Sequence, residues 1–387
     1  MKQAFPLLAL AIGAFAIGTT EFAPMGLLTV IASDLGISLP MAGLIVSAYA
    51  VGVLIGAPLL TLTTGRLTRK SLLLILMIIF TVGNLWSAIS PNYSVLLLSR
   101  LFTSLCHGAF FGVGAVVAAS LVPADRRASA VAAMFMGLTV ANIGGVPLAA
   151  WVGQVAGWRM SFYGIAGFGL ISLACLFFAL PATAKGAAID MRAEIQALGR
   201  PQVLQALTTT VLGAGAMFTV YTYITPILQF DTHLPEPMIT AILALYGIGL
   251  TIGNYLGGRF ADRALDKTLI IVLSAITALL FLFSFTMHMP IAAIATVFAW
   301  GIATFALVPA LQTRIMRVAG NASNLASSVN IGAFNLGNAV GAGLGGAVIS
   351  AGFGFSVIPL VGALVSLIAL GLVLNSARAV QTIQLPD

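Results

Sequence analysis

One carboxylate, Glu21, lies inside a long apolar segment near the start of the chain. The segment FPLLALAIGAFAIGTTEFAPMGLLTV, from Phe5 to Val30, is long enough to cross a bilayer, which takes about 20 mostly apolar residues. A charge near the middle of such a helix costs about 2.5–3.5 kcal/mol on insertion scales, so it marks a functional position by default. Glu21 is therefore the first candidate for chemistry, and the chemistry is proton binding.

Two further ionisable residues, Arg100 and His107, lie well inside an apolar segment. They occur in LLLSRLFTSLCHGAFFG, seven residues apart, and so lie two turns apart on one face of a helix. If this helix runs antiparallel to the first, Arg100 lies at the depth of Glu21. We expect the two charges to pair, because an unpaired buried charge is expensive. The alternative is a structural ion pair beside a packed histidine.

These three side chains favour proton coupling. Burial and a neighbouring cation have opposite effects on the proton affinity of a carboxyl group, so moving the cation or wetting the cavity changes that affinity. One pKa unit corresponds to about 1.4 kcal/mol, and one charge crossing 100 mV to about 2.3 kcal/mol. A change of a few units therefore matches the energy of a proton gradient, and histidine titrates in the same range.

The composition places nearly all of the chain in a membrane. Of the 387 residues, 60% are hydrophobic and only 7% charged, whereas soluble domains carry about 25% charged residues. The net charge of +7 comes from short loops between apolar segments, so it reports topology and not nucleic-acid binding. Cys106 and Cys175 lie in apolar segments and offer neither a disulfide framework nor metal-ligand spacing. We expect no cofactor and no metal.

Twelve apolar segments of helical length predict an all-α membrane protein with twelve transmembrane helices. Membrane-barrel strands would have about 9–11 residues of alternating polarity, and no such pattern occurs. The hydrophilic interval 182–202 divides the segments six and six, which predicts an N-terminal six-helix bundle (1–181), a cytoplasmic linker (182–202) and a C-terminal six-helix bundle (203–387). The approximate limits of the segments are 6–31, 41–64, 71–90, 94–121, 128–154, 160–181, 203–229, 238–262, 268–287, 290–313, 323–350 and 354–376.

The two halves repeat in sequence and indicate an orientation. Tyr49, Gly52, Gly56, Arg66 and Lys70 recur with the same spacing as Tyr246, Gly249, Gly253, Arg263 and Lys267, and parallel repeats of this kind are typical of transporters with a site near the midplane. With both termini in the cytoplasm, fifteen of the seventeen Lys and Arg residues, all except Arg100 and Arg159, lie on the cytoplasmic side. We expect a monomer in a bacterial inner membrane with both termini cytoplasmic.

Several segments are typical of a known family. They are IGTTEFAPMGLLTVIASDLGIS at 17–38 and SSVNIGAFNLGNAVGAGLGG at 327–346, and Arg100 stands where that family has an arginine in its fourth helix. The segment 137–162 resembles the antiporter motif of exporters, although Val146 separates Gly145 from Pro147. On these residues the chain resembles the major facilitator superfamily, in its twelve-span drug:proton antiporter branch and the arabinose or sugar efflux permease-like group.

The resemblance implies a gate at the cytoplasmic ends of the helices. The family's loop motif GxxxDRxGRK keeps only its basic end after the second segment, and Gly65 replaces the aspartate. The copy after the eighth segment keeps Asp262, which we expect to latch the start of the fifth segment near Ala128 and Ser129. The alternatives are that the basic residues only set topology and that Asp262 only balances local charge. The candidate gating residues are Arg66, Arg69, Lys70, Gly145, Pro147, Asp262 and Arg263.

The same fold implies which helices face a substrate cavity. Helices 1, 4, 7 and 10, helped by 2, 5, 8 and 11, offer hydroxyl, amide and aromatic groups, for which plain helix packing is an equal alternative. Without a second buried charge, this mixture suggests a neutral or cationic, moderately apolar small molecule. The candidates are Thr19, Thr20, Tyr49, Phe111, Asn142, Tyr221, Tyr223, Trp300, Asn330 and Asn335.

The sequence therefore predicts a secondary active transporter that exports small compounds by alternating access, driven by proton antiport. One alternative is efflux of a sugar or nucleoside-like metabolite without tight proton coupling. An intramembrane enzyme would need a nucleophile and base or metal ligands within the spans, and a transporter-like sensor would need a soluble output domain. Neither is seen in the sequence, so we expect the protein not to be an enzyme.

Overall fold

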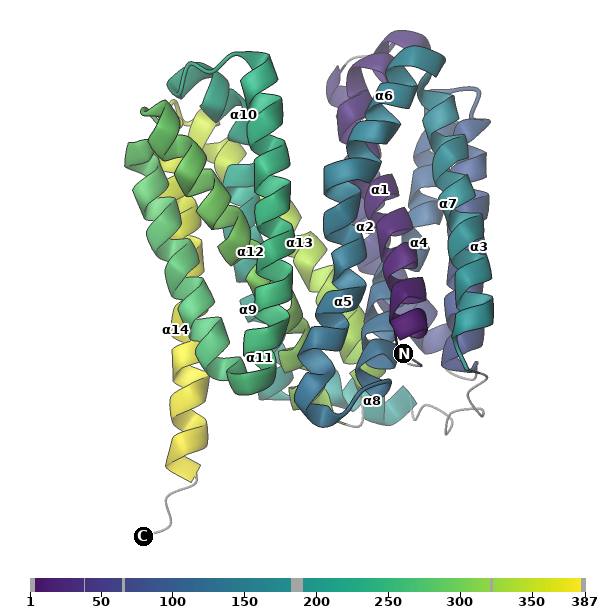
Figure 1. Ribbon diagram of the computed structural model, residues 1–387, viewed down its shortest axis with the longest axis vertical. Helices are drawn as coiled ribbons and strands as arrows, with labels where there is room; N and C mark the ends of the chain where they lie inside the picture. Colours follow the sequence, from purple (N-terminus) through teal and green to yellow (C-terminus); the bar gives the residue numbers. More distant parts are fainter. Residues whose placement is uncertain (1–3, 38, 65–66, 182–190, 321–322, 384–387) are drawn as a thin grey trace. The chain divides into compact units, whose positions relative to one another are not determined.

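The computed structural model describes residues 4–37, 39–64, 67–181, 191–320 and 323–383. Throughout these residues the regular secondary structure is helical (Figure 1). Ten helical stretches in the described part of the chain are long and apolar enough to cross a membrane. Each of the twelve predicted segments is helical, which confirms the predicted all-α membrane fold.

The helices of the first half follow one another with short connections. Thr68 accepts a hydrogen bond from the N–H of Ser71, and Asn92 accepts one from the N–H of Val95, so these side chains cap α3 and α4. Gly157, with φ of +87°, makes the turn from α6 to α7 in a conformation that side chains disfavour. The bounds are α1 Ala4–Leu35, α2 Leu39–Thr63, α3 Arg69–Ala88, α4 Tyr93–Ser120, η1 Ala124–Arg126, α5 Arg127–Val140, η2 Ala141–Gly145, α6 Val146–Ala156, α7 Trp158–Ala179 and α8 Met191–Leu198.

The second half contains α11, in which two helices meet at a kink and which covers two of the predicted segments. The predicted segments 238–262 and 268–287 both lie in α11, where Ala264 alone has a non-helical backbone, with φ of −157° and ψ of 80°. The charged stretch between the two segments therefore makes a sharp kink instead of a loop. The bounds are α9 Pro201–Tyr221, α10 Ile224–Pro226, η3 Ile227–Asp231, α11 Glu236–Thr286, α12 Pro290–Ala319, α13 Ser323–Ser350 and α14 Val357–Ile383.

The chain forms two compact units. Unit 1 comprises residues 1–198 and 319–332, and unit 2 comprises 199–318 and 333–387. In unit 1, α1 packs against α5 and α7, and α4 packs against α2 and α3; in unit 2, α14 packs against α9 and α11. The predicted division into bundles of residues 1–181 and 203–387 stays a prediction, and residues 182–190 of the predicted linker lie outside the described residues.

The outer faces of these helices carry large apolar side chains. Ile291 is 86% exposed, Phe178 77% and Val155 70%, which would be costly in water and suits contact with lipid. Inside, glycines allow close helix approach: a Cβ at Gly52 would lie 1.8 Å from Ser104 Oγ, and one at Gly56 would lie 2.5 Å from Leu105 Cα. Small residues at helix contacts are typical of membrane proteins.

Candidate functional site

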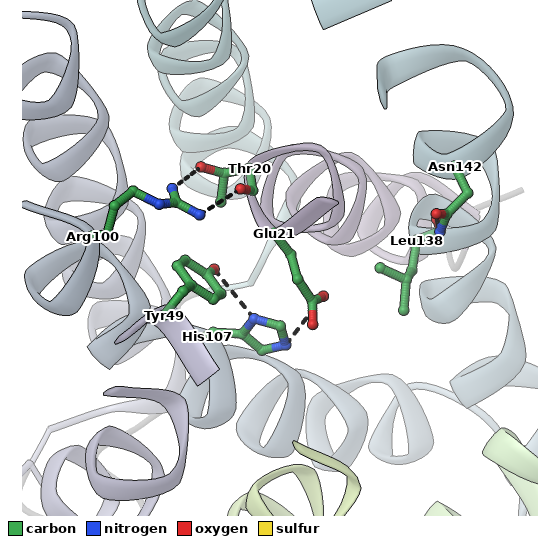
Figure 2. A network of polar contacts seen from close by, with 7 residues as sticks. All are labelled: Thr20, Glu21, Tyr49, Arg100, His107, Leu138 and Asn142. Carbon is green, nitrogen blue, oxygen red and sulfur yellow. Dashed lines mark hydrogen bonds and ion pairs between the residues drawn. The ribbon is translucent and has the colours of Figure 1, made fainter. Parts of the chain in front are cut away.

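Glu21 and His107 lie together in unit 1, on α1 and α4 (Figure 2). Glu21 Oε2 lies 4.0 Å from His107 Nε2, and the exposed fractions of the two side chains are 13% for Glu21 and 4% for His107. The carboxylate thus reaches some solvent space while the imidazole is buried. The sequence analysis places Arg100, and not His107, opposite Glu21, so this contact between α1 and α4 was not predicted.

The second nitrogen of His107 faces Tyr49 on α2. His107 Nδ1 lies 3.2 Å from the Tyr49 hydroxyl, and the centroid of the imidazole lies 5.0 Å from that of the Phe111 ring. Both aromatic residues are buried, at 2% and 1% exposure. In the described conformation Tyr49 and Phe111, predicted to line the substrate cavity, therefore enclose the histidine, and a substrate role for them stays a prediction.

The predicted ion pair between Glu21 and Arg100 is wrong. No ion pair within 4.0 Å joins these two described residues; instead Arg100 donates from NH1 to Thr20 Oγ1 at 2.9 Å and from NH2 to the Thr20 carbonyl at 2.7 Å (Figure 2). The guanidinium also lies over the Tyr49 ring, 4.4 Å from its centroid, and 5.5 Å from that of Phe162. Thr20 and the two aromatic faces are therefore the direct partners of the guanidinium, whose Nε is buried without a hydrogen-bond partner among the described residues.

A further polar residue, Asn84 on α3, supports this arrangement. The Thr20 hydroxyl donates to Asn84 Oδ1 at 2.6 Å, and Asn84 Nδ2 donates to the Phe80 carbonyl at 2.9 Å. Thr20, predicted to contact substrate, is fully buried and binds Arg100 in the described conformation, and its substrate role stays a prediction. The sequence analysis missed Asn84 and Phe162, although a single amide within the apolar segment 71–90 was a signal for Asn84.

The exporter-like segment 137–162 contains a π-helical turn, η2, immediately before Pro147. Asn142 Nδ2 donates to the Leu138 carbonyl at 3.0 Å, inside its own helix. A Cβ on Gly145 would lie 2.2 Å from Thr19 Oγ1, and one on Gly137 would lie 1.8 Å from the Ala11 carbonyl oxygen. These glycines therefore allow α1, which carries Glu21, to lie directly against this segment.

In unit 2, three aromatic residues form a stacked cluster. The ring centroids of Tyr221 and Tyr246 lie 5.2 Å apart, and those of Tyr246 and Trp300 lie 4.9 Å apart. The indole N–H of Trp300 is buried without a hydrogen-bond acceptor among the described residues. Tyr246 matches Tyr49 in the sequence repeat, so both units place a buried tyrosine among aromatic rings.

The remaining candidates from the second half of the sequence are also engaged in packing. The Tyr223 hydroxyl donates to the Ala342 carbonyl on α13 at 2.8 Å. Asn330, in the part of α13 that belongs to unit 1, and Asn335, in unit 2, are buried at 0% and 6% exposure. A role of these residues in binding substrate stays a prediction.

Among the predicted gating residues, Lys70 has a defined structural role. Its Nζ donates to the carbonyls of Phe177 and Leu180, each at 2.6 Å, and so caps the C-terminal end of α7. Arg69 and Arg263 are exposed and Asp262 is partly buried. Arg66 lies outside the described residues, and the gating roles stay predictions. Among the residues that the structure describes, no group of three or more His, Cys, Asp or Glu side chains is placed to hold a metal ion.

Comparisons with known proteins cover nearly the whole length of the chain. The sequence model of the Major Facilitator Superfamily matches residues 10–330 and 211–382. The chain is 58% identical to the Inner membrane transport protein YdhP of Escherichia coli (strain K12), over 98% of this chain and 97% of that protein. It is 33% identical to the Chloramphenicol resistance protein of Streptomyces lividans, over 87% of each chain. The structure of the E. coli fucose:proton symporter FucP is similar with a TM-score of 0.75 and 13% identity, over 96% of this chain and 98% of that one.

Proposed function

Because this chain belongs to the major facilitator superfamily and is a membrane transporter, we propose that it is a proton-coupled exporter of small neutral or monocationic, moderately apolar compounds. The observation that carries the proposal is the carboxylate of Glu21, which lies in a membrane-spanning helix beside a titratable histidine and without an ion pair to Arg100. A carboxylate whose charge is not neutralised by a fixed cation is free to take up and release a proton.

The contacts around Glu21 support a proton-exchange role. Since Arg100 is held by Thr20 and by two aromatic rings, losing or gaining a proton at Glu21 breaks no hydrogen bond of the arginine. His107 lies between the carboxylate and the Tyr49 hydroxyl, so it offers one nitrogen to each. Bound substrate and bound proton then compete for the same partly exposed carboxylate, which is the basis of antiport.

Export, and not uptake, is supported by the segment around η2. It resembles the antiporter motif of exporters, and its π-helical turn lies against Thr19, two residues before Glu21. Irregular turns of this kind are common at functional sites. The names of two relatives, an inner membrane transport protein and a chloramphenicol resistance protein, also favour export from the bacterial inner membrane.

The charge pattern supports the remaining parts of the proposal. With fifteen of the seventeen basic residues on one side, both termini lie in the cytoplasm. A single chain contains both sequence repeats, so a monomer is the transporting unit. Substrate reaches the carboxylate of Glu21 alternately from each side of the membrane, and the hydroxyl, amide and aromatic groups named from the sequence remain its candidate contacts.

Transport in proteoliposomes tests this function. Purified protein is reconstituted into liposomes that contain ethidium, a monocation. The movement of ethidium across the liposome membrane is then followed with and without a pH gradient. We expect the unchanged protein to use the gradient, and Glu21→Gln to exchange ethidium but to lose gradient-driven transport. Asp125→Asn removes the same charge from an exposed loop and serves as the control. Gradient-driven transport by Glu21→Gln at the level of the control would refute the proton role, and transport by the unchanged protein without any effect of pH would favour uncoupled efflux.

A further inference from the structure

The linker helix α8 carries a buried carboxylate, Glu194, that the site around Glu21 does not use. Glu194 is only 4% exposed. Its Oε2 accepts a hydrogen bond from the backbone N–H of Leu325 at 3.0 Å, and its Oε1 accepts one from Asn324 Nδ2 at 3.3 Å. Both partners belong to the first turn of α13, 130 residues further along the chain. A carboxylate from one helix therefore caps the start of another.

The physical reason for this contact is the unpaired N–H groups at a helix start. The first N–H groups of α13 have no acceptor within the helix, and a carboxylate at this end also gains from the helix dipole. Usually the residue just before the helix supplies the cap. Here the cap comes from Glu194, and the positive charge of Arg69 at the start of α3 interacts with the same carboxylate. Three elements of unit 1 thus meet at Glu194.

The position of α13 makes this cap important for more than local stability. The residues of α13 up to Gly332 belong to unit 1, and the residues from Ala333 onward belong to unit 2. Within unit 1, Ser327 Oγ donates to the Gly112 carbonyl on α4 at 2.9 Å. Since the residues of α13 up to Gly332 belong to unit 1, a contact that fixes its first turn limits the movement of this part of α13 relative to α4.

We propose that Glu194 is a positioning residue of the transport cycle, which holds the first turn of α13 in the described conformation and releases it when the transporter changes state. The proposal rests on the proposed function for its link to transport, but the contact itself is tested without substrate or proton gradient. Removing the charge of Glu194 then favours the state in which the start of α13 is free.

Hydrogen–deuterium exchange on the purified full-length protein in lipid nanodiscs tests the cap. Losing a helix cap costs about 0.5–2 kcal/mol, which corresponds to an increase of about 2- to 30-fold in the exchange rate at the start of α13. We expect this increase in peptides that cover 323–332 in Glu194→Gln and a smaller one in Glu194→Asp. Asp125→Asn, an exposed acidic residue of unit 1, is the matched control and leaves exchange there unchanged.

Two results would overturn the proposal. One is unchanged exchange at 323–332 in Glu194→Gln. The other is an equal rise in all helices of unit 1, which would mean general destabilisation instead of a specific cap. For the link to transport, we expect Glu194→Gln to change the maximal rate of ethidium export more than its KM, with Asp125→Asn changing neither. An effect on KM alone would contradict a role in the conformational cycle. Failure of the unchanged protein to transport ethidium would count against the proposed function, and the exchange data would still decide on the cap.

Discussion

Arg100 and Glu21 are both charged groups of the same helix bundle, but they have different partners. Arg100 is fully buried, with two hydrogen bonds to Thr20 and two aromatic rings beside it. Glu21 keeps partial exposure and lies near His107. These contacts fit the proposal that the arginine is a fixed positive charge in the core and that Glu21 is the group that changes its protonation.

A double-mutant cycle tests this division at the residue scale. Arg100→Ala removes bonds to Thr20, and hydrogen bonds to charged groups are worth about 1.5–3 kcal/mol. We expect Arg100→Ala and Thr20→Val to be non-additive, because the two residues share a bond, with a coupling of about 0.5–3 kcal/mol. The coupling of Arg100→Ala with Glu21→Gln should be smaller. Unfolding in detergent measures both cycles. A larger coupling energy of Arg100 with Glu21 than with Thr20 would support an ion pair between Arg100 and Glu21.

Much of this residue-level arrangement could not be predicted from the sequence. The depth of Arg100 and Glu21 in their helices was correct, but the sequence does not show which residue of α1 faces α4. The backbone carbonyl of Thr20 is an acceptor that no sequence pattern displays, and the ring of Tyr49 serves as a second partner. The expectation that a buried charge pairs with an opposite charge did not include either of these two partners.

At the scale of elements, the contact between α1 and η2 depends on two neighbouring glycines that differ in their surroundings. A Cβ on Gly145 would lie 2.2 Å from Thr19 Oγ1, whereas nothing lies within 4 Å of a Cβ on Gly144. The helix pattern predicted a straight span over 128–154, and the π-helical turn Ala141–Gly145 was not predicted. This turn lies against α1 and ends two residues before Pro147, and it has no periodicity of its own.

Alanine substitutions at the two positions form a matched pair. We expect Gly145→Ala to destabilise the protein by about 1–3 kcal/mol, the usual cost of overpacking, and to reduce transport because α1 is displaced. Gly144→Ala should be neutral or stabilising by up to about 1 kcal/mol, since it only restricts the unfolded chain. Thermal unfolding and ethidium transport measure the two effects. Equal stability and equal transport of the two variants would mean that the close approach of α1 to η2 contributes to neither.

A second contact between elements joins the end of α1 to the start of α7. Asp34 Oδ2 accepts hydrogen bonds from Arg159 NH1 at 2.6 Å and from Trp158 Nε1 at 2.9 Å, and Arg159 NH2 donates to the Ser90 carbonyl at 3.1 Å. These bonds from Arg159 and Trp158 lower the pKa of Asp34 below its usual value. The charge pattern predicts Arg159 on the opposite side of the membrane from the basic residues of the loops, and this network gives it a carboxylate partner, Asp34.

The pH dependence of stability tests this contact. Because the pKa of Asp34 is lower in the folded state, its stabilisation is complete above the unfolded value of about 3.9 and is lost as the pH falls through the folded value. The pair is partly exposed, so the effect is modest, up to about 1 kcal/mol. We expect Asp34→Asn to be less stable than the unchanged protein at pH 6–8, with the difference becoming smaller as the pH falls below the unfolded pKa of about 3.9. A difference that is the same at every pH would exclude the charge as its cause.

At the scale of the whole molecule, the sequence predicted the fold well because hydropathy and charge determine it directly. All twelve predicted segments are helical, including 323–350, which is rich in Gly, Asn and Ser. The break in α11 lies between the predicted segments 238–262 and 268–287, but its form as a kink at Ala264 and the cap by Glu194 were missed. Both depend on contacts between residues far apart in the chain or on a local backbone change, and neither leaves a periodic pattern.

The proposed substrate class follows from the buried charges of unit 1. Glu21 supplies one negative group, while Arg100 is enclosed and does not face solvent. Under the proposed function we expect other monocations and neutral, moderately apolar compounds to compete with ethidium for transport, and dicarboxylates or phosphate esters of similar size to compete poorly. Inhibition of ethidium transport by a panel of such compounds measures this preference. Strong and selective inhibition by the anions would place a cation, and not Glu21, at the binding site.

The proton role of Glu21 is tested most directly by the protons that substrate binding displaces. Calorimetric titration of the purified protein with ethidium, in two buffers of different ionisation enthalpy at the same pH, gives that number. We predict that ethidium binding releases protons from the unchanged protein at pH 7, and that Glu21→Gln binds ethidium with no proton release. Proton release by Glu21→Gln equal to that of the unchanged protein would contradict the assignment of Glu21 as the proton-binding group.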